Sequence, residues 1–184
     1  GISQIIQNNK KVLDIGCGDG TLLKYLKKNC NTKGVGFDYS SDLIKIAKKN
    51  SKNLEFICMD MNYIDKINFR IKKFDYIITK RSVQNLTSWK AQKKFINVLH
   101  KFSNKKTKII LIESSKTSLD KINIFRKKLK LNKINMPWHN LYLNDKKMIN
   151  SKFKKIKLIK IHEIFSTYYF MSRIINALNS KQLK

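Results

Sequence analysis

Short apolar runs alternate with amphipathic segments along most of this 184-residue chain. Apolar runs of roughly four to eight residues, rich in Ile, Val and Phe, are typical of strands that are buried on both faces of a sheet. The runs that predict strands lie at 11–15, 34–38, 54–58, 74–79, 108–113 and 155–163. Because helical patterns fill the gaps, we expect an α/β fold, with a doubly wound, mostly parallel sheet and helices on both faces.

Amphipathic periodicity and candidate caps locate the helices. The segment 42–49 has one apolar face, which consists of Leu43, Ile46 and Ala47. Ser88 and Ser118 stand where N-caps belong, because a serine hydroxyl can accept a hydrogen bond from a free backbone N–H of the first turn. These two caps predict helices over 89–102 and 118–131.

The first strand run ends in a glycine-rich turn. Gly16, Gly18 and Gly20 are spaced two apart, and a helical pattern begins directly after them. Glycine permits a backbone conformation closed to other residues and lets a ligand approach closely, and the following helix points its free N–H groups at the turn. Asp14, on the strand, would repel a pyrophosphate but suits an amino group. The turn therefore predicts a site for a ligand with a positive end.

With Asp14, these glycines complete the motif acidic-x-Gly-x-Gly-x-Gly, in which the chain resembles the class I S-adenosylmethionine (SAM) dependent methyltransferases. Two further acids fit that family. Asp38 ends the second run, 22 residues after Gly16, where nucleotide-binding folds place an acid for the ribose hydroxyls. Asp60 and Met61 follow the third run, where the family has an acid for the adenine amine and an apolar neighbour for the ring. The third glycine spacing of a nicotinamide dinucleotide site is not met.

The resemblance implies SAM as the cofactor and a Rossmann-like methyltransferase fold with a sheet of the seven-stranded type. The cofactor-binding residues that it implies are Asp14, Gly16, Cys17, Gly18, Gly20, Asp38, Tyr39, Asp60, Met61 and Lys80. Only about ten residues precede the first strand run, and about 20 follow His162. We therefore expect a fold trimmed at both ends, or one in which 165–178 takes the place of the seventh strand.

The segment 136–143 is the candidate substrate-recognition region, since inserts beyond the carboxyl ends of the strands close over ligands in open α/β sheets. Trp138, His139 and Asn140 are the candidate substrate contacts, and His139 is the candidate base because its unperturbed pKa of about 6.5 suits proton transfer near neutral pH. The alternative is a turn in which Trp138 packs in the core. Arg81, after the fourth strand run, is a candidate anchor for a substrate carboxylate or phosphate; its alternative is a surface arginine.

These residues are compatible with three functions. The first is methyl transfer to an oxygen or nitrogen of a small-molecule acceptor, such as a metabolite or glycan precursor. The sequence after the fourth run lacks both the Asn/Asp-Pro-Pro-aromatic tetrapeptide and the cysteine nucleophile that mark adenine and cytosine methyltransferases. A Trp-His-Asn-Leu-Tyr-Leu stretch and a Tyr-Tyr-Phe-x-Ser-Arg run resemble a subgroup of bacterial methyltransferases that we associate with such acceptors. An RNA or protein methyltransferase and a non-catalytic SAM-binding module are the alternatives.

Length and composition limit the number of domains and the kinds of partner and metal site that we expect. We expect a single domain over 1–184, with a cofactor half at about 10–115 and a substrate-recognition region at about 116–184. The net charge of +28 suits a nucleic-acid partner, but Lys, Asn and Ile share A+T-rich codons, so biased base composition explains the charge without selection for binding, and a nucleic-acid partner is not favoured. The three cysteines show no metal-ligand spacing, so no metal is expected. No apolar stretch approaches the roughly 20 residues of a membrane span, and we expect a cytoplasmic protein.

Overall fold

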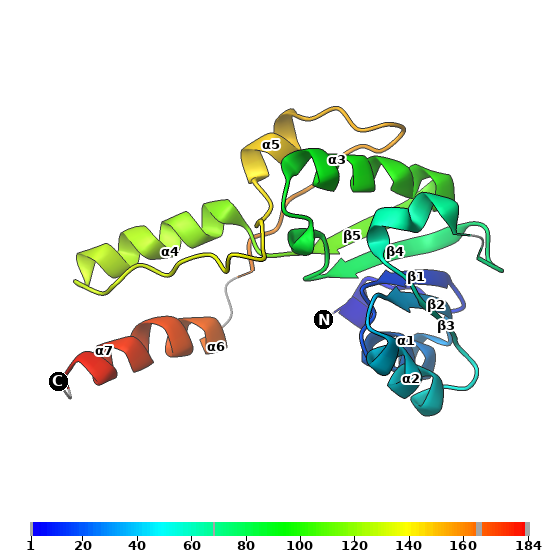
Figure 1. Ribbon diagram of the computed structural model, residues 1–184, viewed down its shortest axis with the longest axis horizontal. Helices are drawn as coiled ribbons and strands as arrows, with labels where there is room; N and C mark the ends of the chain where they lie inside the picture. The colour runs from blue at the N-terminus through cyan, green and yellow to red at the C-terminus, as the bar shows by residue number, and fades with distance from the viewer. Residues whose placement is uncertain (1, 68, 165–166, 183–184) are drawn as a thin grey trace.

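The computed structural model describes residues 2–67, 69–164 and 167–182, and it is built on a parallel sheet (Figure 1). Its strands are β1 (Lys11–Ile15), β2 (Lys33–Asp38), β3 (Glu55–Cys58), β4 (Phe74–Lys80) and β5 (Ser103–Ile112). Within the described residues they form a five-stranded sheet in the order β3-β2-β1-β4-β5. The predicted α/β class and the first five strand runs are confirmed, to within a few residues at their ends. From β1 the chain builds the sheet outwards through β2 to β3, and it then returns to the other side of β1 to add β4 and β5. At such a reversal of direction, a crevice opens beyond the carboxyl ends of the two central strands, β1 and β4.

Helices cover both faces of the sheet. The helices α1 (Thr21–Cys30) and α2 (Ser41–Asn50) pack on one face, while α3 (Trp89–Val98) with the 3₁₀ turns η4 (Leu99–Phe102) and η2 (Met61–Lys66) packs on the other. Successive strand residues point to opposite faces, so Val12 joins the α1 side and Leu13 the α3 side. Ser88 caps α3 as predicted, accepting a hydrogen bond from the N–H of Ala91 at 3.1 Å.

Two helix predictions need correction. On α2, Ile44 and Ala47 are buried, whereas Leu43 is exposed and Ile46 is 46% exposed. Four apolar residues make a stripe wider than the contact, and only the side of it formed by Ala47 and Ile44 faces the sheet. The second error concerns a cap: Ser115, not Ser118, caps the next helix, and its hydroxyl accepts the N–H of Ser118 at 3.1 Å.

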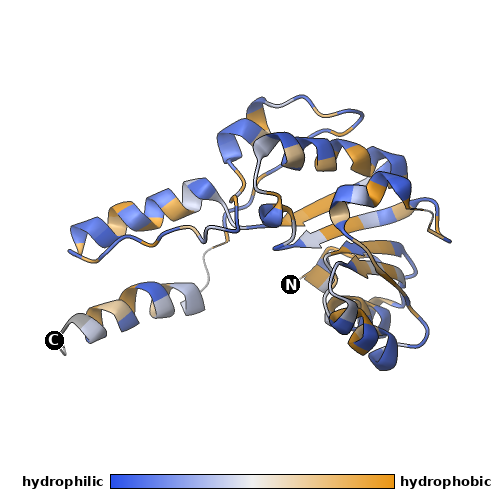
Figure 2. Ribbon diagram, viewed as in Figure 1, coloured by the Kyte–Doolittle hydropathy of each residue, from blue (hydrophilic) through white to orange (hydrophobic). Residues whose placement is uncertain are grey.

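That helix, α4 (Lys116–Lys128), projects from the sheet and carries the C-terminal segment beside it (Figure 1). The C-terminal elements are α6 (Thr167–Phe170), the π-helical η5 (Met171–Ile175) and α7 (Asn176–Gln182). Leu119 and Ile122 of α4 and Ile174 of η5 form a small buried cluster, separate from the two clusters on the sheet. We call α4 with α6, η5 and α7 the arm; Figure 2 shows hydrophobic residues along its two halves.

The sixth predicted strand, at 155–163, is wrong. After α5 (Asp145–Asn150), the chain is irregular over these residues apart from an isolated bridge between Phe153 and Ile156. Alternating apolar and polar residues favour an extended chain, but a strand also needs a partner edge; here Ile159 is 89% exposed. His162 accordingly lies in irregular chain and not in a strand. The start of the expected segment 165–178 falls on residues outside those described, and its remainder is helical.

Two further 3₁₀ turns lie next to the sheet: η1 (Ile2–Gln4) before β1 and η3 (Val83–Asn85) after β4. Among the described residues no helix has the length and apolar character needed to span a bilayer.

Candidate active site

The glycine turn after β1 is closed against the loop after β4. Gly16 and Gly18 have φ angles of 73° and 55°, in the left-handed region that favours glycine. A Cβ on Gly16 would lie 2.0 Å from the hydroxyl oxygen of Ser82, whereas one on Gly18 would meet nothing within 4 Å. The first glycine is therefore required by protein packing, and the second leaves open space. An open cradle of this kind is what a bound cofactor would occupy.

Asp38 is held at the carboxyl end of β2. Its Oδ2 accepts the N–H of Gly18 at 2.9 Å and its Oδ1 accepts the N–H of Ser40 at 3.0 Å. Each carboxylate oxygen has a second lone pair, so both oxygens remain able to accept a ligand hydroxyl. The acid is thus fixed in place by the turn that it helps to shape.

Asp14 lies beneath the same turn and is nearly inaccessible to solvent. Burial raises the pKa of its carboxyl group to about 7, with Lys80 lowering the pKa and Asp38 raising it to smaller extents. Ionised Asp14 is consequently costly unless a cation compensates for it. Burial likewise raises the pKa of the Cys17 thiol, which stays protonated and packs in the core.

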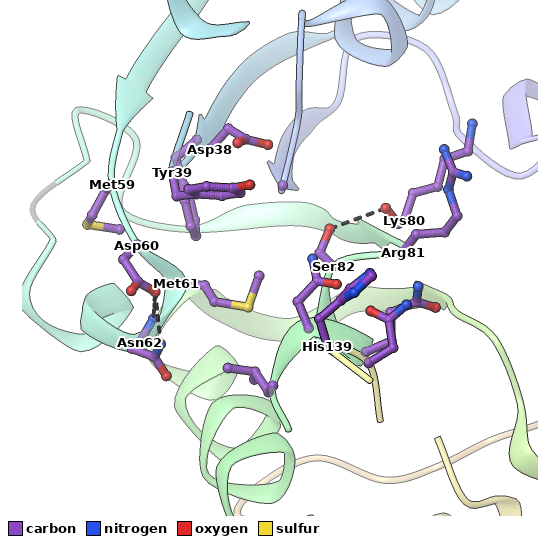
Figure 3. A pocket seen from close by; sticks show the side chains of 16 residues that line it. Asp38, Tyr39, Met59, Asp60, Met61, Asn62, Lys80, Arg81, Ser82 and His139 are labelled. Carbon is purple, nitrogen blue, oxygen red and sulfur yellow. Dashed lines mark hydrogen bonds between the residues drawn. The ribbon is translucent and has the colours of Figure 1, made fainter. Parts of the chain in front are cut away.

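A cleft of about 460 Å³ lies in front of these residues, at the carboxyl ends of the strands (Figure 3). One part of its lining comes from Gly16 and from the ends of β2 and β3, and another from the loop after β4 and from the segment that carries His139. The lining residues are Gly16, Phe37, Asp38, Tyr39, Met59, Asp60, Met61, Asn62, Lys80, Arg81, Ser82, Gln84, Asn85, Leu86, His139 and Asn140.

The structure brings most of the sequence-predicted site residues to this cleft. Those that line it are Gly16, Asp38, Tyr39, Asp60, Met61, Lys80, Arg81, His139 and Asn140. The predicted cofactor residues that do not line it are Asp14, Cys17, Gly18 and Gly20. Trp138 also lies outside the lining and is 93% exposed, so it is neither in the cleft nor in the core.

A half-buried carboxylate that sequence reasoning missed organises the loop after β4. Glu113 accepts the hydroxyl of Thr79 at 2.7 Å and the N–H groups of Ser82, Val83 and Gln84 at 3.1, 3.2 and 3.3 Å. Burial raises the pKa of this carboxyl group, and the four hydrogen bonds lower it. Because three successive N–H groups converge on one side chain, the loop that carries Arg81 is held in one conformation.

Two glutamines connect this loop to the segment with the predicted substrate contacts. The carbonyl of Gln84 accepts the N–H of Leu141 at 2.7 Å. The side-chain amide of Gln92 donates to the carbonyls of Leu141, Leu86 and Val83 at 2.7, 3.2 and 3.4 Å. We call Glu113, Gln84 and Gln92 the polar latch. Through it, residues 139–141 are aligned beside the end of β4.

The side-chain carbonyl of Asn140 is the unusual group on this wall. Its Oδ1 is buried and has no hydrogen-bond partner in the structure. A buried acceptor without a partner costs roughly 1–3 kcal/mol, and it lies on a residue that lines the cleft. Because the oxygen itself is shielded from solvent, a ligand that donates a hydrogen bond would reach it only after the side chain turns towards the cleft.

Of the three residues that sequence reasoning missed, the sequence offered a signal for Glu113 but none for Gln84 and Gln92. Glu113 directly follows β5, and an acid just past a strand was the same signal that singled out Asp38 and Asp60. Gln84 and Gln92 carried no such signal, because their roles depend on contacts with a segment about 50 residues further along the chain. In the described parts of the chain, no group of three or more His, Cys, Asp and Glu residues is arranged to hold a metal ion.

Comparison with known proteins bears on this site. A family model described as "Methyltransferase domain" matches residues 6–163. A Mus musculus protein named Probable tRNA methyltransferase 9B is 32% identical over 115 residues, which are 61% of this chain and 20% of that protein. The Ubiquinone biosynthesis O-methyltransferase of Coxiella burnetii is 35% identical over 78 residues, 40% of this chain and 32% of that protein. The chain thus spans a third or less of these relatives.

Solved structures share the fold. The structure of PKMT2 from Rickettsia typhi in complex with AdoHcy (S-adenosylhomocysteine) is 26% identical, with a TM-score of 0.52, and the match covers 66% of this chain and 24% of that one. The parallel sheet, the glycine turn after β1 and the cleft beside Asp38 agree with the family match over most of the chain. This chain therefore belongs to the SAM-dependent methyltransferases of class I, with their Rossmann-like fold.

Proposed function

We propose that this protein transfers a methyl group from SAM to an oxygen or nitrogen of a small-molecule acceptor that carries a negatively charged group. SAM, when bound, supplies an activated methyl group on a sulfonium. Much of the acceleration of such a displacement can come from holding the two reactants in line. The role of the protein is then to bind both reactants in one cleft with the acceptor atom facing the methyl group.

The cofactor part of the proposal rests on the glycine turn and the acids around it. Gly16 to Gly20 and Asp14 would hold the methionine end, since a buried carboxylate suits an amino group. Asp38 would accept the ribose hydroxyls, and Asp60 with Met61 would contact the adenine. The Oδ1 of Asp60 already accepts the N–H of Asn62 at 2.8 Å, which fixes that carboxylate at the edge of the cleft (Figure 3).

The unpartnered Oδ1 of Asn140 is the observation that carries the acceptor part. With the side chain turned towards the cleft, it would accept a hydrogen bond from the amine or hydroxyl that receives the methyl group, or from a donor next to it. Lys80 and Arg81 lie on the same cleft, and neither forms an ion pair with an acid in the described residues. These cations favour an acceptor with a phosphate or carboxylate. His139 is the candidate base for a hydroxyl acceptor.

Replacement of Asn140 tests this assignment. The purified chain is assayed for formation of S-adenosylhomocysteine with phosphorylated and carboxylated amines and alcohols, and SAM binding is followed by calorimetry. With an accepted substrate, Asn140→Ala should lower kcat/KM by about fivefold, since a hydrogen bond contributes on the order of 1 kcal/mol, and leave SAM affinity unchanged.

Trp138→Ala is the matched control, because Trp138 neighbours the same loop but lies outside the cleft. Equal losses in both variants, or a loss of SAM affinity in Asn140→Ala, would contradict the assignment of Asn140 to the acceptor. Binding of SAM without turnover of any acceptor would instead favour the non-catalytic binding module.

RNA is the second candidate acceptor. The observation that favours it is the 32% identity, over 61% of this chain, to the protein named Probable tRNA methyltransferase 9B. A phosphodiester next to the modified nucleoside would meet the same two cations, Lys80 and Arg81. Methylation of an RNA but of no small-molecule acceptor would identify RNA as the acceptor and contradict the small-molecule proposal.

A further inference from the structure

A second groove, of about 430 Å³, lies along the outer side of α3 and is strongly basic. It is separate from the methyl-transfer cleft. Its lining residues are Lys90, Lys93, Lys94, Asn97, Val98, His100, Lys101 and Lys154. Lys73 extends the charge at one end, since its ammonium donates to the carbonyl of Lys101 at 2.7 Å. Five lysines line the groove, and no acid does.

Two segments far apart in the sequence form this surface, and both lack acidic residues. There is no Asp or Glu between Tyr76 and Ile112, nor between Lys146 and His162. The fold places them side by side, where the chain after α5 passes over α3 (Figure 1). The N–H of Lys154 donates to Oδ1 of Asn97 at 2.6 Å, which joins the two segments at the groove.

This segregation of charge goes beyond a general excess of lysine. Biased base composition raises the number of lysines along the whole chain, but it neither removes the acids from two segments nor brings those segments together. Elsewhere, acids lie beside lysines, as in the ion pair of Lys45 with Asp42. The charge on the groove is therefore a property of the fold, and it suits a polyanion.

The shape and composition of the groove define the partner further. A protein partner would require an apolar centre in the interface, whereas Val98 is the only apolar residue of the lining. Binding to an anionic lipid surface is strengthened by apolar side chains that insert beside the charges, and Val98 is the only such residue that the lining offers. No aromatic side chain lines it, so bases would not stack there. A phosphodiester backbone, which needs only spaced positive charges, fits best.

The groove also points at the methyl-transfer cleft. Leu86 lines the cleft, Ser88 caps α3, and Lys90 is the first lysine of the groove. From there α3 runs for ten residues, roughly 15 Å at 1.5 Å per residue, towards Lys101. One end of the groove therefore lies four residues along the chain from the cleft-lining Leu86.

We propose that this groove binds the phosphodiester backbone of single-stranded RNA without sequence preference and leads the strand to the methyl-transfer cleft. The proposal deepens the second candidate function and rests on it for the choice of RNA over DNA. Binding itself requires neither SAM nor turnover, so it can be measured independently.

Titration of fluorescent polyuridylate by anisotropy over a range of salt concentrations, without SAM, tests the proposal. The groove variant is Lys94→Gln with Lys101→Gln. The matched control is Lys48→Gln with Lys49→Gln, two exposed lysines at the end of α2 that remove the same charge from the opposite face. Loss of two phosphate contacts should weaken RNA binding about tenfold near 0.1 M salt. It should also reduce the magnitude of the slope of log K against log salt concentration by about 1.4. The control should change neither.

Three outcomes would overturn the proposal. Equal losses in the two double variants would show that net charge alone binds RNA. Competition by polyglutamate as effective as by unlabelled polyuridylate would show an unspecific anion surface. Tighter binding of polythymidylate DNA would reject RNA as the partner. Calorimetry with SAM on the same proteins separates RNA binding by the groove from the proposed methyl transfer. Failure to bind SAM would contradict the proposed methyl transfer but would not affect the result on the groove.

Discussion

At the scale of single residues, the proposed role of Asp14 would make SAM binding depend on pH. The pKa of its buried carboxyl group is raised to about 7, so the group is largely protonated below neutral pH. Only the carboxylate attracts an amino group. We therefore expect SAM affinity to fall as pH decreases, by about tenfold per unit below the pKa, and Asp14→Asn to bind SAM weakly at all pH values. Calorimetry between pH 6 and 8 measures this; a flat profile in the unsubstituted protein would contradict it.

The same shift predicts how stability without SAM depends on pH. The pKa of Asp14 is higher in the folded than in the unfolded state, where it is near 3.8. The folded state therefore binds more protons between these values, and the free energy of unfolding falls as pH rises from about 4 to above 7. At about 1.4 kcal/mol per unit, the contribution is on the order of 4 kcal/mol.

Asp14→Asn should remove this dependence, because an amide does not ionise. Urea unfolding at pH 5 and pH 8 measures it, and the variant should be more stable than the unsubstituted protein at pH 8 by a few kcal/mol. Asp42→Asn, on an exposed acid of α2, is the control and should leave the dependence unchanged. An equal fall in stability with pH in Asp14→Asn would refute the assignment.

At the scale of elements, the polar latch determines how the loop after β4 and the segment 139–143 face one another. Glu113→Gln keeps the shape of the side chain but turns one accepting oxygen into a donor. At least one N–H of η3 then loses its acceptor, at a cost of about 1–3 kcal/mol. We expect faster amide hydrogen exchange in both segments.

Glu163→Gln controls for loss of a carboxylate, since Glu163 is exposed and pairs with Lys121 of α4. It should leave exchange in the two latched segments unchanged. If Glu113→Gln sped exchange only at β5, the latch would be local to that strand and would not align the cleft.

At the scale of the whole molecule, the arm has its own small hydrophobic cluster, apart from the clusters on the sheet. Ile174→Ala should destabilise the arm by about 2–5 kcal/mol, the range for truncation of a fully buried isoleucine, with SAM affinity unchanged. Hydrogen exchange of α4 and calorimetry measure the two effects. Ile124→Ala, at an exposed position of α4, is the control. Loss of SAM binding in Ile174→Ala would show that the arm supports the cofactor site.

Local sequence patterns were sufficient to predict an element or a site residue wherever the contacts that define it are close in sequence. The strand, glycine turn and helix around Gly16 to Gly20 follow from residues within about 20 positions. Asp38 and Asp60 could be located because the first ends a strand run and the second closely follows one. Ser88 was identified as a cap because the donor is three residues away. Ser118 was not a cap, because Ser115 starts the helix one turn earlier.

The sequence by itself determined the α/β class, the five parallel strands and the place of the cleft at their carboxyl ends, since the order of strands and turns already brings these ends together. Only the tertiary structure decided the rest. The run at 155–163 alternates like a strand but lies beside no partner edge. Glu113, Gln84 and Gln92 meet through contacts between distant segments, and the basic groove exists because the fold joins two acid-free segments. Each of these depends on pairing across the chain, which local periodicity does not encode.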